Sequence, residues 1–394
     1  MSNLEEYYER QKREYKPNKI FSGTKGIFAV AVICFFGCWV LLFVGLSFSN
    51  PYRFSLPYNA IDFQKIAYID NQFVMYGVDF NAKYAKQLVI FTSLDGKKWD
   101  KAVIAKVKPE TKSDADSYYS ISNLGTIAYF NHQCMLIGAV PKILVSPDCH
   151  NWSYLETKQD NGNSTPFWNA GSSVVANDSL YVGTNRSGVY QSKDGITWHK
   201  ESLPYPQESE QRNFENSFLS MAAGNNKLIT STNWMHNGKN VGLIYTKDLT
   251  TNEWSYEVYP TSVGNITRGK DRFVAMTGDS ALVLVDGDSE WGRNENVSWN
   301  GETEVREPSE LVFGLNNKFV SINLVNISDN GYDWSAINLR KSDLYGTTKI
   351  ACSIYTCVSV DDNYQIIISN NGTDWELVDF KYKNPKPRWW RRFI

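Results

Sequence analysis

The stretch SKDGITW, residues 192–198, carries a clear local signal of backbone structure. Its Asp-Gly pair is typical of a tight turn, because glycine adopts positive φ without steric cost and aspartate bonds nearby backbone. Apolar β-forming residues precede it in GVYQS (188–192), and a large apolar side chain, Trp198, ends it. The stretch therefore predicts a hairpin turn whose tryptophan leaves the turn and covers the adjoining sheet.

This stretch recurs along the chain in five clean copies and two degenerate ones. The copies are SLDGKKW (93–99), SPDCHNW (146–152), SKDGITW (192–198), TKDLTTNEW (246–254), VDGDSEW (285–291), SDNGYDW (328–334) and SNNGTDW (369–375). Their defining residues are Ser93, Asp95, Gly96, Trp99, Asp148, Trp152, Asp194, Gly195, Trp198, Trp254, Trp291, Gly331, Trp334, Gly372 and Trp375. Recurrence at such intervals indicates a repeat architecture, and seven copies are better explained as structural than as one active site.

The residues around each copy supply the remaining strands of a repeat. A pattern of strand, polar turn and strand precedes every copy, as in IAYIDNQFVMYG (66–77) and IAYFNHQCMLIG (127–138). A third strand enters the turn, and a fourth follows the tryptophan, as in WELVDF (375–380). Residues 60–380 give about 46 residues per repeat, the size of a four-stranded blade. The sequence therefore predicts an all-β fold, a seven-bladed β-propeller of four-stranded blades.

The repeated phrase resembles the Asp-box, or bacterial-neuraminidase (BNR) repeat, of sialidases, sortilin-type receptors and photosystem II assembly-factor-like proteins. Here the form is S-x-D-G-x-x-W, one residue shorter than the sialidase form, and it looks more like that of the assembly-factor propellers. The resemblance implies the propeller fold and leaves the function open. Sialidases also carry an Arg-Ile-Pro segment, whereas Arg53 here is followed by Phe and Ser.

An uncharged run of 23 residues, 26–48, is long enough to cross a bilayer as a helix. Basic residues are concentrated in 1–25, which places that segment in the cytoplasm by the positive-inside rule. We therefore expect a single-pass protein of the cytoplasmic (inner) membrane, with a linker at 49–59 and a periplasmic or extracellular propeller. The alternative is a cleaved signal peptide, although the apolar run exceeds the usual length of one.

Four of the six cysteines follow the apolar run, in a compartment that permits disulfides. Cys352 and Cys357 flank the turn of a predicted hairpin, so we expect a cross-strand disulfide between them. A bond between Cys134 and Cys149 is left open. No cysteine or histidine spacing predicts a metal site, and no cofactor is expected.

No catalytic motif is recognised, and we expect a protein that is not an enzyme. The formal net charge of −2 excludes a typical nucleic-acid binder. Arginines and acids are too scattered to assign a sialidase site or a carboxylate pair. Carbohydrate binding or glycoside hydrolysis in the central funnel is the alternative function.

Binding is expected on the face formed by the longer connections, because function concentrates on such loops. The long segments are 79–87, 106–122, 156–173, 203–218 and 232–240. Their candidate binding residues, with the Tyr, Trp and Arg character of interface hot spots, are Tyr118, Tyr119, Trp168, Arg212, Phe214, Trp234 and His236. The predicted partner is an unidentified envelope or membrane protein. The alternative is that these aromatic residues only pack their own loops.

The C-terminal segment 381–394 combines basic and aromatic residues that suit an anionic membrane interface. These residues are Arg388, Trp389, Trp390, Arg391 and Arg392. The tail is expected to touch lipid headgroups, and the alternative is a docking peptide for a membrane partner.

Overall fold

The computed structural model describes part of the chain. The described residues are 61–79, 87–104, 125–140, 142–162, 167, 170–184, 188–205, 218, 220–236, 239–277, 280–294, 311–321, 326–336, 349–360 and 365–380. The predicted cytoplasmic segment, apolar span, linker and C-terminal tail lie outside them. Within these ranges no helix has the length and apolar character to cross a bilayer.

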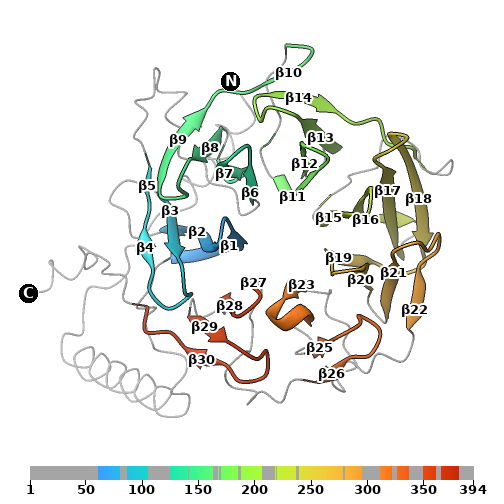
Figure 1. The fold of residues 1–394 in the computed structure, drawn as a ribbon. Helices are drawn as coiled ribbons and strands as arrows, with labels where there is room; N and C mark the ends of the chain where they lie inside the picture. Colours follow the sequence, from blue (N-terminus) through green and yellow to red (C-terminus); the bar gives the residue numbers. More distant parts are fainter. Residues whose placement is uncertain are drawn as a thin grey trace, which may run out of the picture. The chain divides into compact units, whose positions relative to one another are not determined.

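Seven blades, each of four consecutive antiparallel strands, make up most of the described chain, and two of these sheets gain a fifth, parallel strand from the preceding blade (Figure 1). The first four blades are β1 (Ile61–Ile69), β2 (Gln72–Asp79), β3 (Gln87–Ser93), β4 (Asp100–Lys101); β6 (Thr126–Phe130), β7 (Gln133–Ile137), β8 (Ile143–Ser146), β9 (Asn151–Leu155); β11 (Ala170–Ala176), β12 (Ser179–Thr184), β13 (Gly188–Ser192), β14 (Thr197–Lys200); and β15 (Ser220–Gly224), β16 (Lys227–His236), β17 (Lys239–Asp248), β18 (Glu253–Tyr259). The last three are β19 (Val263–Arg268), β20 (Arg272–Thr277), β21 (Ala281–Val285), β22 (Gly292–Asn294); β23 (Leu311–Gly314), η1 (Leu315–Asn317), β24 (Lys318–Ser321), β25 (Asn326–Ser328), β26 (Ser335–Ala336); and β27 (Lys349–Cys352), β28 (Cys357–Val360), β29 (Ile366–Ser369), β30 (Glu376–Leu377).

The blades close into a ring around a central axis. The first strand of each blade contacts the first strand of the next, and β27 of the last blade returns to contact β1 (Figure 1). The predicted seven-bladed propeller of four-stranded blades is thereby confirmed. Radial closure leaves only short outer edges, which is how this architecture limits exposed strand edges.

The first hairpin of most blades uses a tight two-residue turn. Five of the described turns have two consecutive residues at positive φ: Asp70–Asn71, Asn131–His132, Asn177–Asp178, Asn225–Asn226 and Asn316–Asn317. Such a pair matches the right-handed twist of the strands, and Asn and Asp tolerate it better than other non-glycine residues. The polar turns of the sequence pattern therefore position the first two strands of these blades.

Two short strands link neighbouring blades and were not predicted. β5 (Val103–Ile104) leaves the first blade and pairs in parallel with β9 of the second, with Ile104 opposite Trp152. β10 (Lys158–Gln159) leaves the second blade and pairs in the same way with β14 of the third, with Gln159 opposite Trp198. Each strap covers an outer edge that would otherwise present unpaired backbone groups.

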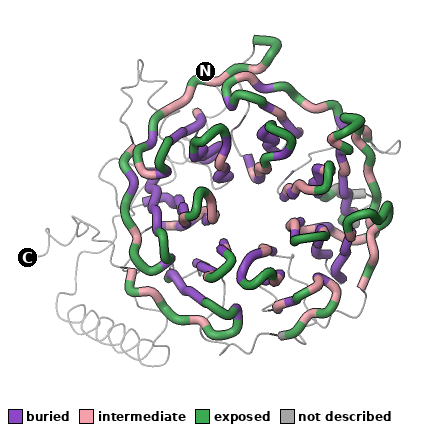
Figure 2. Tube along the Cα trace, in the orientation of Figure 1, coloured by how far each residue is buried: buried purple, intermediate pink, exposed green. Residues whose placement is uncertain are grey.

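The core lies between the blades. Buried residues are concentrated in the two middle strands of each blade, buried and intermediate residues are mixed along the innermost strands, and exposed residues gather at turns and on the outer strands (Figure 2). Seven apolar clusters occur in the described structure, each shared by two adjacent blades, including one between the last blade and the first. Side chains alternate between the two faces of each strand, so every blade contributes to two clusters.

Candidate functional site

The repeated stretch forms the turn between the third and fourth strands of each blade, and is called the tryptophan turn below. In the first blade, Ser93 Oγ accepts a hydrogen bond from Gly96 N at 2.8 Å, and Asp95 Oδ1 accepts from Lys97 N and Lys98 N, each at 2.8 Å. Trp99 Nε1 donates to Gly96 O at 2.8 Å. The local hydrogen bonds of the serine and the aspartate agree with the sequence prediction, and the bond from the Trp99 indole to the Gly96 carbonyl is an additional finding.

These hydrogen bonds hold the turn aspartates in the ionised form. Partial burial alone would raise the pKa of Asp95, but the backbone N–H groups of Lys98 and Lys97 outweigh it, and the pKa is lowered. Bonds from the Asn151 backbone and side chain, opposed by desolvation, lower the pKa of Asp148 strongly. Each of these carboxylates accepts several hydrogen bonds, which explains why aspartate occurs at this position of the turn.

In the last two blades asparagine replaces this aspartate. Asn330 Oδ1 accepts from Tyr332 N and Asp333 N, each at 2.8 Å, and its Nδ2 donates to Asp333 Oδ2 at 2.8 Å. The same arrangement joins Asn371 to Asp374, with an Nδ2–Oδ2 distance of 2.6 Å. In these two turns the carboxylate is found three residues later, directly before the tryptophan, and the asparagine side-chain amide donates a hydrogen bond to it.

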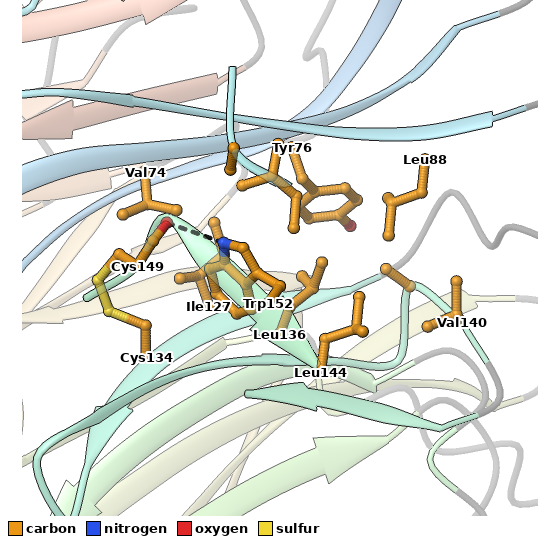
Figure 3. Close-up of a cluster of buried hydrophobic side chains, with 13 residues drawn as sticks. Val74, Tyr76, Leu88, Ile127, Cys134, Leu136, Val140, Leu144, Cys149 and Trp152 are labelled. Carbon is orange, nitrogen blue, oxygen red and sulfur yellow. Dashed lines mark hydrogen bonds between the residues drawn. A yellow bond between two sulfur atoms is a disulfide. The ribbon is translucent and has the colours of Figure 1, made fainter. Parts of the chain in front are cut away.

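Each tryptophan packs between its own blade and the preceding one. The tryptophans in the seven interblade clusters are Trp99, Trp152, Trp198, Trp254, Trp291, Trp334 and Trp375. Trp152 lies among Val74 and Tyr76 of β2 and Leu136 of its own blade (Figure 3). This confirms the prediction that the tryptophan covers the adjoining blade.

The glycine of the turn is required for two reasons. Gly96 has φ of 74°, and a Cβ atom there would lie 2.5 Å from Val358 Cγ2 of the preceding blade. In the second blade Cys149 takes this place at φ of 57° and forms a disulfide with Cys134 (Figure 3). A side chain is therefore accommodated in that turn, where it forms a covalent bond to the start of β7.

The structure contains a disulfide for each of the two cysteine pairs that the sequence analysis considered. The predicted bond between Cys352 and Cys357 is present, and these residues are direct cross-strand partners with Cα atoms 4.0 Å apart. The pairing of Cys134 with Cys149, which the sequence left open, also forms, with Cα atoms 5.2 Å apart.

The degenerate turn of the fourth blade contains a buried ion pair that the sequence did not predict. Lys247 Nζ lies 2.6 Å from Glu201 Oε2, and the two side chains are 1% and 7% exposed. Trp254 Nε1 donates to the same carboxylate at 2.8 Å, in place of a turn carbonyl. Burial, and then the charge of Glu201, raise the pKa of Tyr181 to about 12. The sequence shows that Lys247 lies next to the turn aspartate, Asp248. It does not show that the partner of this lysine, Glu201, belongs to the preceding blade.

The first strands of all seven blades line a central, open cavity of about 280 Å³. Hydroxyl and amide groups line it from the second to the fifth blade, whereas Val312, Phe313 and Ile350 line it from the sixth and seventh. Several of these hydroxyls are used between blades: Thr126 Oγ1 and Ser173 Oγ lie 2.7 Å apart, and Ser220 Oγ accepts from Ile266 N at 2.6 Å. The described lining contains no aspartate or glutamate, so it assembles no carboxylate pair.

The predicted binding residues lie mostly beyond the described part of the chain. Those outside it are Tyr118, Tyr119, Trp168, Arg212 and Phe214, together with the tail residues Arg388, Trp389, Trp390, Arg391 and Arg392. Trp234 and His236 belong to β16, where they pair with Val241 and Lys239 of β17. No group of three or more possible metal ligands occurs among the described residues.

The hairpin that carries Trp234 extends past its own sheet. β15 pairs with β16 only as far as Ser231, and β18 pairs with β17 only from Gly242. The three pairs from Trp234–Val241 to His236–Lys239 therefore continue as a two-stranded ribbon. This ribbon projects on the face opposite the tryptophan turns.

These features define the chain as a seven-bladed β-propeller with an ordered tryptophan turn in each blade. No protein-family model matches it, and no curated protein does either. It is similar to PorZ, an essential bacterial surface component of the type-IX secretion system of Porphyromonas gingivalis, with 9% identity and a TM-score of 0.51 over 82% of this chain and 39% of that one. It is also similar to a puromycin-hydrolyzing peptidase of Mycobacterium tuberculosis, with 5% identity and a TM-score of 0.50 over 81% of this chain and 53% of that one.

A third similar structure is YCF48 from Cyanidioschyzon merolae, with 12% identity and a TM-score of 0.48 over 81% of this chain and 98% of that one. This chain spans well under two thirds of the length of PorZ and of the peptidase. Likeness at such identities shows the fold alone.

Proposed function

We propose that this chain is a membrane-anchored, extracytoplasmic scaffold that binds another envelope or membrane protein through the face of its longer connections. The observation that carries the proposal is the projecting ribbon of β16 and β17. A two-stranded ribbon is only marginally stable by itself. A segment of this kind, carried on a rigid scaffold, is a common place for binding residues. Trp234 and His236 lie on this ribbon.

The cysteines and the apolar run support the proposed compartment. Two disulfides join the four cysteines that follow residues 26–48, which supports an oxidising location for the propeller. The apolar run supplies the proposed anchor, and the basic aromatic tail is proposed to contact lipid. The turn hydrogen bonds support the resemblance to Asp-box propellers of the assembly-factor type, and a non-enzymatic role is part of the same proposal.

Photo-crosslinking in intact membranes tests the scaffold. Probes at Trp234, His236 and Tyr119 should give one dominant protein adduct, identified by mass spectrometry. A probe at Lys97 in a tryptophan turn is the matched control and should not give that adduct. If the loop probes give no protein adduct, or the same adducts as Lys97, the proposed scaffold role is wrong.

Carbohydrate binding or hydrolysis remains the weaker proposal. The central cavity offers hydroxyl groups, but its described lining has no acidic side chain to act as general acid or nucleophile. Retention on immobilised glycans without any protein adduct would favour it over the scaffold.

A further inference from the structure

The turn face is the face formed by the first hairpin turn of each blade and by the tryptophan turns. On this face the seventh blade departs from the polar pattern of the other first hairpins. Its turn has four residues, Ser353–Thr356, and two of them are large and exposed: Ile354 at 56% and Tyr355 at 72%. The two-residue turns of the first four blades consist of Asn, Asp and His. Exposed apolar side chains at such a tip need an explanation that turn formation does not give.

This tip is held rigidly. The Cys352–Cys357 disulfide closes its base, and Ser353 Oγ accepts hydrogen bonds from Tyr355 N at 3.1 Å and Thr356 N at 2.9 Å. The turn of the sixth blade also binds it, since Leu315 N donates to Ser353 O at 2.7 Å and Asn316 N donates to Ile354 O at 2.8 Å. Ile354 and Tyr355 are therefore presented in a fixed position, so binding to them costs little ordering of the backbone.

A third exposed apolar side chain lies in the adjacent turn of the first blade. Leu94 is 80% exposed, and its turn rests on β28, because Gly96 approaches Val358 there. β28 begins directly after the tip. The residues equivalent to Leu94 in the other clean turns are Pro147, Lys193, Asp329 and Asn370. Leu94, Ile354 and Tyr355, named the closure patch, thus lie where the ring closes between the seventh and first blades.

The turn face as a whole carries more acidic than basic side chains, although the turn that holds Leu94 also holds Lys97 and Lys98. Its described turns contain twelve acidic residues and four lysines, and Arg268, Arg272 and Lys318 beside these turns pair with Asp286, Asp271 and Asp329. The acidic residues are Asp70, Asp95, Asp148, Asp178, Asp194, Asp271, Asp286, Asp288, Glu290, Asp329, Asp333 and Asp374, and the lysines are Lys97, Lys98, Lys193 and Lys270. This charge opposes approach to anionic lipid, and it opposes the meeting of two copies through the same face. It favours a surface that carries positive charge.

We propose that the closure patch is a docking site for a second protein partner, one that presents an apolar groove rimmed by lysine or arginine side chains. Tyr355 and Ile354 would fill the groove as anchors, and the acidic turns would pair with its rim. Aromatic anchors surrounded by polar contacts are typical of interface hot spots. The site is on the face opposite the proposed scaffold site and does not depend on it.

Selection from a displayed library of random peptides tests the docking site. The full chain, purified in detergent, serves as bait, and the double variant I354S/Y355S serves for counter-selection. Enriched peptides should combine aromatic or aliphatic residues with lysine or arginine. They should bind the variant about ten-fold more weakly or worse, and bind the wild type more weakly as NaCl is raised. The matched control is I196S, which removes an apolar residue 43% exposed in the turn of the third blade.

Each other outcome overturns the proposal. Peptides without basic residues, or equal loss of binding in I196S, would mean that the patch does not select the stated partner. Binding of the full chain to phosphatidylglycerol vesicles that is lost in I354S/Y355S would assign the patch to lipid. Dimerisation at high concentration that is lost in the same variant would assign it to a second copy.

Discussion

The side-chain amide of Asn371 donates to the carboxylate of Asp374 at 2.6 Å, within the tryptophan turn of the seventh blade. In the third blade the residues at these two places are Asp194 and Thr197, and Thr197 N donates to Asp194 Oδ1. The clean turns thus keep one carboxylate between the two positions, either before the glycine or before the tryptophan. If both positions held a carboxylate, the two groups would compete for hydrogen-bond donors that suffice for only one of them.

The variant N371D should therefore destabilise the propeller. It replaces a hydrogen bond by repulsion between two carboxylates, and we expect a loss of about 1 kcal/mol at neutral pH and low salt. The double variant N371D/D374N restores a single carboxylate and should recover most of the loss. Urea unfolding measures both. Equal stability of N371D and the wild type at low salt would refute the single-carboxylate explanation.

The Lys247–Glu201 pair predicts a much larger effect. The variant K247M leaves the carboxylate of Glu201 buried beside the Trp254 Nε1 donor without a positive charge to balance it, and should lose about 3 kcal/mol or more. The double variant K247M/E201L removes both charges and should recover much of that stability. The exposed pair Lys97–Glu376 provides the control, since K97M should cost less than about 1 kcal/mol. Similar losses in K247M and K97M would contradict this.

The propeller was predictable because one turn requires particular residues. The turn needs glycine at positive φ, a carboxylate or amide that accepts hydrogen bonds from backbone N–H groups, and a tryptophan that packs between blades. These requirements leave a recognisable sequence, and its seven copies indicated seven blades. The straps β5 and β10 were not predictable, because two residues carry no periodicity. The Glu201–Lys247 pair joins residues of adjacent blades, and nothing local relates them.

The closure patch shows another limit of sequence reasoning. The sequence predicted a hairpin turn between Cys352 and Cys357, and the structure adds that Ile354 and Tyr355 in this turn are exposed. Of the candidate binding residues, Trp234 and His236 are placed on the projecting ribbon. The other candidates lie outside the described residues and stay predictions.

In the turn of the second blade Cys149 occupies the position that is glycine in the other clean turns, and this replacement can be tested. Removing the Cys134–Cys149 bond, which closes a loop of sequence separation 15, should cost about 3 kcal/mol. The replacement at 149 then matters, because φ is 57° there. C134A/C149G should be more stable than C134A/C149A by about 1 kcal/mol, since glycine adopts this φ without strain. Unfolding by urea without reductant compares the two, and a more stable C134A/C149A would show that backbone strain does not decide the residue at this position.

Asp148 should make the stability of the propeller depend on pH. Hydrogen bonds, chiefly from Asn151, place its folded pKa well below the ordinary value of 3.8. The stabilisation is therefore fully present above pH 3.8 and is lost as the pH falls through that value toward the lower folded pKa. The variant D148N should be less stable than the wild type at pH 7, and the difference should shrink as the pH falls from about 5 to 2. Melting temperatures measured across that range for both proteins check this, with D95N as a second turn whose aspartate also has a lowered pKa. A constant difference between D148N and the wild type would mean that the carboxylate of Asp148 is no better stabilised in the folded protein than in the unfolded chain.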